Sequence, residues 1–124
     1  MSVFQNWYEI PVQLPERYNT WVHDNVKPEE LQSVEENHHI TLLYGFDPVA
    51  YDQVKSLADS FGPFGDDFKF GEVRQGDFAP VKFVPIQSEK LQRCFDTLNR
   101  VFKHKHYLHN GQYLSHVTLC TLKK

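Results

Sequence analysis

Two short segments of the chain repeat one pattern of residue types: histidine, apolar, threonine, apolar. They read His39-Ile40-Thr41-Leu42 and His116-Val117-Thr118-Leu119. In an extended strand, successive side chains point to opposite faces. Each segment would therefore place an imidazole beside a hydroxyl on one face and two apolar anchors on the other. We expect the two polar faces to line a common groove.

Two imidazoles and two hydroxyls are what the cleavage of a phosphodiester needs without a metal. A neutral imidazole takes a proton from the attacking hydroxyl or water, and a protonated one gives a proton to the leaving oxygen. Thr41 and Thr118 would donate hydrogen bonds to the non-bridging phosphate oxygens, where charge must be held. The alternative for either segment alone is an ordinary half-exposed strand, with a threonine chosen for its strand preference.

The elements that must position these motifs alternate between strands and helices. The order is strand, helix, strand, helix, two strands, helix, strand, without regular βαβ spacing, and it predicts an α+β domain. The predicted elements are a strand over 7–12, helical segments over 15–26 and 28–31, a strand over 39–44, a helix from Asp47-Pro48 to Gly62-Pro63, two strands within 68–86 about a turn at 75–77, a helix capped by Ser88, and a strand over 113–122.

Apolar spacing also predicts the core. Tyr44 continues the phase of Ile40 and Leu42, so we expect it to be buried. The helix after Ser88 is the most strongly patterned in the chain. Its apolar face comprises Leu91, Cys94, Phe95, Leu98, Val101 and Phe102.

Length and composition fit a single domain spanning residues 1–124. The 124 residues are 40% hydrophobic and 15% aromatic, which excludes a disordered chain. No apolar run approaches the roughly 18 residues of a bilayer span, and the N-terminus lacks a secretory signal pattern. Cys94 and Cys120 stand alone, as in proteins of the reducing cytosol. We therefore expect a cytoplasmic protein without a membrane partner.

The charge balance limits the class of ligand. The formal net charge is −3, from 13 Lys+Arg and 16 Asp+Glu. Proteins that wrap long nucleic acids usually carry a basic surplus. We therefore expect no long duplex as a partner, and a nucleic-acid ligand would be a small one.

The two motifs, with the order of elements around them, resemble the 2H phosphoesterases, also called LigT-like or 2′,5′ RNA ligase-like proteins, over most of the chain. The resemblance implies a pseudo-symmetric, two-lobed α+β fold, with antiparallel strands lining a central cleft and helices outside. It implies attack on nucleotide phosphodiesters without metal or other cofactor, with His39, Thr41, His116 and Thr118 as catalytic residues. The stretch 39–46 looks most like small phage members, including the anti-CBASS nucleases, which destroy cyclic di- and trinucleotide immune signals.

Other residues could complete the groove. Glu9 on the first predicted strand could orient a histidine, or it could simply be exposed. Lys82 and Arg74, in the central hairpin, could contact a second phosphate. Some aromatic side chains on or beside the predicted strands could stack on a base, with core packing as the competing explanation. They are Trp7, Tyr8, Trp21 and Tyr113.

The remaining histidines have simpler interpretations. His104, His106 and His109 could be drawn as metal ligands, but no cysteine or carboxylate completes the set. We expect them to be solvated at a helix end, with no metal bound. His38 lies on the opposite strand face from His39, and we expect no catalytic role for it.

Together these features predict a phosphodiesterase acting on a small nucleotide, with a cyclic di- or trinucleotide as the favoured substrate. One alternative is an enzyme that acts on RNA ends, opening 2′,3′-cyclic phosphates or cutting 2′–5′ bonds. A second is a non-catalytic module that sequesters a nucleotide, and a third is a metal-binding protein.

Overall fold

The structure is a computed structural model that describes residues 6–76, 79–108 and 111–123. Within these residues the chain has the predicted α+β composition, with antiparallel strand pairing. In one sheet β1 (Trp7–Pro11) pairs with β3 (His39–Tyr44). The other sheet has the order β2 (Leu31–Val34), β7 (His116–Leu122), β6 (Val81–Gln87), β4 (Lys69–Phe70), and β5 (Arg74–Gln75) also pairs with β6.

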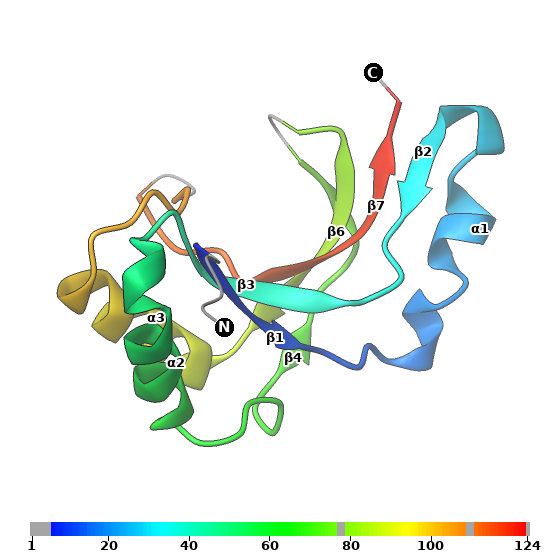
Figure 1. The fold of residues 1–124 in the computed structure, drawn as a ribbon. Helices are drawn as coiled ribbons and strands as arrows, with labels where there is room; N and C mark the ends of the chain where they lie inside the picture. Colours follow the sequence, from blue (N-terminus) through cyan, green and yellow to red (C-terminus); the bar gives the residue numbers. More distant parts are fainter. Residues whose placement is uncertain (1–5, 77–78, 109–110, 124) are drawn as a thin grey trace.

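The longer helices lie together at one end of the molecule (Figure 1). α2 (Tyr51–Asp59) contacts α3 (Glu89–Val101), and these helices also contact β1 and β3, respectively. The short α1 (Trp21–Asn25) lies at the other end in Figure 1. Single 3-10 turns occupy Glu16–Tyr18, Pro28–Glu30 and Pro48–Ala50. No helix in the described part of the chain has the length and apolar character needed to cross a membrane.

The two histidine motifs lie in strand pairs that have the same register. Pro11 of β1 lies opposite His39, and Pro85 of β6 lies opposite His116. The residue after each proline donates its backbone N–H to the carbonyl of the residue before the histidine, at 3.0 Å in the first pair and 2.9 Å in the second. The repeated sequence pattern is therefore also a repeated local structure.

Each motif strand contains a β-bulge at the third residue after the histidine. The pairing skips Leu42 in β3 and Leu119 in β7. An extra residue of this kind shifts the alternation of faces by one. The next residues, Leu43 and Cys120, are therefore buried together with the bulged leucines.

The bulge overturns the prediction for Tyr44. Regular alternation from Ile40 and Leu42 would have buried its side chain. Because the extra residue shifts the phase, Leu43 takes the core position and Tyr44 is 48% exposed.

Other elements differ from the prediction in their ends. β2 was not predicted, because its four residues carry little apolar signal and are mostly exposed. The strand expected before the turn at 75–77 is broken into β4 and β5, and the last strand begins at His116 rather than at residue 113. Val101 is 60% exposed because α3 ends at this residue.

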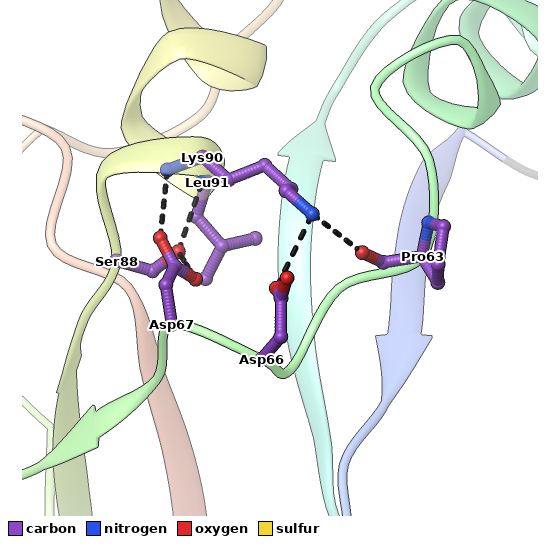
Figure 2. Close-up of polar contacts among 6 residues, drawn as sticks. All are labelled: Pro63, Asp66, Asp67, Ser88, Lys90 and Leu91. Carbon is purple, nitrogen blue, oxygen red and sulfur yellow. Dashed lines mark hydrogen bonds and ion pairs between the residues drawn. The ribbon is translucent and has the colours of Figure 1, made fainter.

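The start of α3 is fixed by a side-chain network, shown in Figure 2. Ser88 caps the helix as predicted, since its hydroxyl accepts from the Leu91 N–H at 3.1 Å. The same hydroxyl donates to Asp67 at 2.7 Å, and the other Asp67 oxygen accepts from the Lys90 N–H at 3.1 Å. The Lys90 ammonium reaches back to the Pro63 carbonyl. The network ties α3 to the loop that follows α2.

We expect Ser88→Ala to lower the free energy of unfolding by about 1 kcal/mol, the usual effect of losing such a cap. Asp67→Asn should lower it in a pH-dependent way. Burial by itself raises the pKa of the Asp67 carboxyl, but the hydrogen bonds from Ser88 and Lys90 outweigh this and lower it. The carboxylate therefore stabilises the fold above its ordinary pKa, and this stabilisation is lost as the pH falls through the lower folded-state value. Urea unfolding of the wild type and of each variant at pH 7 and pH 2.5 tests these expectations. For Asp67→Asn, a loss of stability that is equal at the two pH values would contradict the expected pH dependence.

Candidate active site

The motif side chains take the two faces expected for them. His39, Thr41, His116 and Thr118 are half-buried on the polar faces of β3 and β7. The intervening anchors, Ile40, Leu42, Val117 and Leu119, are at most 2% exposed. The apolar anchors thus fix both strands in the core and hold the polar face of each motif in position.

Both motif histidines are oriented by the same backbone contact. Nδ1 of His39 lies 2.8 Å from the Asn37 carbonyl oxygen, and Nδ1 of His116 lies 2.9 Å from the Leu114 carbonyl oxygen. A carbonyl only accepts, so each Nδ1 carries the proton. Nε2 is then the ring nitrogen left available to accept or donate a proton. In both motifs the accepting carbonyl belongs to the residue two positions before the histidine, a contact that the residue types do not reveal.

Residues of both motif strands line one cavity, which has a volume of about 570 Å³. Thr41 of β3 and His116 of β7 both line it. Its other lining residues include the aromatic side chains of Tyr44, Phe83, His106 and Tyr107 and the guanidinium of Arg74. His39 and Thr118 are not among the described residues that line it. The structure therefore joins one histidine and one threonine, from different motifs, in a single cavity.

The two histidines have different neighbours. Glu9 lies near His39, with Oε2 3.2 Å from Nδ1. The other oxygen of Glu9 accepts from the Trp7 indole N–H at 3.0 Å. His116 instead meets the Phe83 ring, with a centroid separation of 5.2 Å. Of the two interpretations of Glu9, the structure supports the one in which it orients a histidine.

Two of the residues expected to stack on a base, Tyr8 and Tyr113, are packed in the core. Both are only 8% exposed. The Tyr113 ring stacks on Phe95 with centroids 4.2 Å apart, and its hydroxyl donates to the Thr41 carbonyl at 2.8 Å. The Tyr8 hydroxyl lies 3.4 Å from Asp59, and burial, followed by the charge of Asp59, raises the Tyr8 pKa. Neither residue lines the cavity that Thr41 and His116 share.

Two other expected contacts, Trp7 and Lys82, do not line the cavity. Trp7 is 41% exposed, with its indole N–H already bonded to Glu9. Lys82 donates to the Gln75 side chain at 2.9 Å, and Gln75 lines the cavity whereas Lys82 does not. Arg74 is therefore the basic residue of the central hairpin that lines the cavity.

His106 lines the cavity, although the sequence predicts that it is solvated at a helix end. Its ring packs on Phe95 and Tyr113, with centroid separations of 5.5 and 5.3 Å. Burial, with smaller contributions from His104 and His116, lowers the His106 pKa to about 4. Its Nδ1 is buried without a hydrogen-bond partner among the described residues. His106 is therefore neutral at pH 7 and packs as a largely apolar ring.

The other helix-end histidines make local contacts. Nε2 of His104 lies 2.7 Å from the Asn99 side-chain oxygen, and burial lowers the His104 pKa. His109 lies outside the described residues. Within the described ranges no group of three or more histidine, cysteine or acidic side chains could hold a metal ion.

The burial of His106 makes stability depend on pH. Because its folded-state pKa lies below that of the unfolded chain, unfolding takes up a proton as the pH falls from about 6.5 to 4. We expect this residue to remove about 3 kcal/mol of stability over that interval. His106→Leu keeps the apolar packing and should remove this part of the acid sensitivity. Urea unfolding of both proteins from pH 7 to pH 4 measures the difference, and parallel stability curves would contradict the assignment.

No protein-family model matches the sequence, and no curated protein matches it either. A function for the protein is therefore inferred from the geometry of the site itself.

Proposed function

We propose that the protein is a 2H-type phosphodiesterase that cleaves a small nucleotide, with a cyclic di- or trinucleotide as the favoured substrate. The observation that carries the proposal is the repeated contact between histidine Nδ1 and a backbone carbonyl. In both motifs it leaves Nε2 of the histidine available for proton transfer, on a strand face that also carries a threonine. The matching register and matching bulge of the two strand pairs support a pseudo-symmetric, two-lobed site.

The cavity supports a nucleotide as the ligand. Its volume of about 570 Å³ lies within the range typical of small-molecule sites. Tyr44 and Tyr107, which are 48% and 64% exposed, offer aromatic surface on which a base could stack. The guanidinium of Arg74 could pair with a phosphate. The small basic content and the net charge of −3 favour a ligand with few phosphates over a long polymer.

The proposed chemistry uses only groups that these strands carry. One histidine takes the proton of the attacking oxygen, and the other protonates the leaving oxygen. Thr41 and Thr118 donate hydrogen bonds to the non-bridging oxygens, which gain charge in the transition state. With a 3′–5′ bond we expect the ribose 2′-hydroxyl to attack and a 2′,3′-cyclic phosphate to form.

The test is incubation with cyclic dinucleotides, cyclic trinucleotides and oligonucleotides that end in a 2′,3′-cyclic phosphate, followed by chromatography of the products. We expect turnover of the cyclic oligonucleotides, unchanged by EDTA. Turnover of the RNA ends alone would assign the protein to RNA-end processing. If the protein binds a nucleotide tightly and the ligand is recovered intact after hours, the protein is a sequestering module and not an enzyme.

A further inference from the structure

The two strand pairs differ at one position that faces the motifs. The residue paired with Thr41 is Glu9 on β1, and the residue paired with Thr118 is Phe83 on β6. Three other features of the strand pairs correspond: the prolines opposite the histidines, the bulges, and the carbonyl contacts of both Nδ1 atoms. A carboxylate in one half and an aromatic ring in the other make the two imidazoles chemically unequal.

His39 lies in an environment that favours a proton donor. Its Nδ1 faces two acceptors, the Asn37 carbonyl at 2.8 Å and the Glu9 carboxylate at 3.2 Å. The Trp7 indole holds the other Glu9 oxygen, which limits the freedom of the carboxylate to turn away. A carboxylate this close stabilises the positive charge of an imidazolium.

His116 lies in an environment that favours a proton acceptor. Phe83 occupies the position that the carboxylate has in the other half, and no ion pair forms with His116 among the described residues. The charged group that shares its cavity is Arg74 of β5, whose guanidinium lies 5.8 Å from the centroid of the Phe83 ring. His106, in the segment before β7, is a further imidazole nearby. A cation in the same cavity disfavours a second positive charge.

We propose that Glu9 divides the work of the two histidines, with His39 as the proton donor to the leaving oxygen and His116 as the acceptor from the attacking hydroxyl. This rests on the proposed phosphodiesterase function. His116 Nε2 takes the 2′-hydroxyl proton as that oxygen bonds to phosphorus. The bond from phosphorus to the 5′ oxygen breaks, and His39 Nε2 gives that oxygen its proton. Glu9 is a positioning residue that acts through His39 and does not contact the substrate.

A leaving group that needs no proton separates the two roles. The probes are the four nucleoside 3′-(4-nitrophenyl phosphates), which release nitrophenolate, and the matching dinucleotides, which release a 5′-alkoxide. We expect His39→Ala to lose about 10²–10⁴-fold on the dinucleotides yet stay within about tenfold of the wild type on the nitrophenyl esters. His116→Ala should lose about 10²–10⁴-fold on both.

Glu9→Gln keeps the size of the side chain and removes its charge. It should lower dinucleotide turnover by about tenfold, with little effect on the nitrophenyl esters. The matched control is Phe83→Leu at the corresponding position of the other half, which should change both substrates by the same factor. Thermal unfolding shows that each variant is folded.

The outcomes are distinct. In one outcome the wild type cleaves both substrates while His116→Ala, instead of His39→Ala, keeps near-wild-type rates on the nitrophenyl esters. This result would overturn the assignment of roles and leave the phosphodiesterase proposal standing. Equal loss on both substrates for Glu9→Gln overturns the role of Glu9 in proton donation. If the wild type cleaves neither these probes nor the cyclic oligonucleotides, the proposed function itself fails.

Discussion

Replacing either motif histidine by alanine is expected to remove nearly all cleavage of the substrate's phosphodiester bond while the fold remains intact. Each proton transfer typically accounts for about 10²–10⁴-fold in rate, and the remaining imidazole cannot perform both transfers in one step. The side chains of His39 and His116 are half-buried on polar strand faces, so truncation leaves the buried anchors of both strands in place. Initial rates on the cyclic oligonucleotide that the wild type cleaves measure the loss of activity.

The matched control for these variants is His23→Ala. The side chain of His23 is 91% exposed on α1 and contacts Asp24. Its removal should leave turnover unchanged, and thermal unfolding of all three variants should stay close to that of the wild type. Wild-type rates in either motif variant would contradict a site that uses two imidazoles.

The motif threonines are expected to have the next largest effect. Thr41→Val and Thr118→Val preserve shape and remove the hydroxyl, so the developing charge on the phosphate loses a donor. Removal of one such donor typically costs about 10²–10³-fold in kcat. Thr41 lines the cavity together with His116, whereas Thr118 lies outside its lining, so we expect the larger loss from Thr41→Val.

Serine provides the control for the threonine variants. Thr41→Ser and Thr118→Ser retain the hydroxyl and should keep most of the wild-type kcat. If the valine variants also keep it, the hydroxyls do not stabilise the transition state. If serine and valine reduce kcat equally, the methyl group and strand packing matter instead of the hydrogen bond.

The faces of the motif strands could be predicted from the sequence because a strand alternates its side chains. Ile40 and Val117 are apolar and buried, and the histidines beside them are not. The bulges could not be predicted in this way. A bulge depends on how the partner strand pairs, and nothing in the leucine at its position marks the extra residue. Regular alternation therefore predicts a core position for Tyr44, although its side chain is exposed and lines the cavity.

The surroundings of the motifs were only partly predictable, since they depend on contacts between distant segments. Tyr113 looked suited to a base, yet its ring is taken up by Phe95 on α3. His106 looked solvated beyond the helix end, yet the chain returns it to the cavity beside His116. Glu9 was recognisable as a polar strand residue, but only the register of β1 against β3 brings it to His39.

The most direct test of the central claim is a crystal structure of the protein with a nucleoside–vanadate complex, which mimics the five-coordinate phosphorus of the transition state. We expect Nε2 of His39 and Nε2 of His116 to lie within hydrogen-bond distance of oxygens on the same vanadium, on opposite sides of it. A vanadate bound by one of these rings alone, with the other directed elsewhere, would contradict the two-imidazole site.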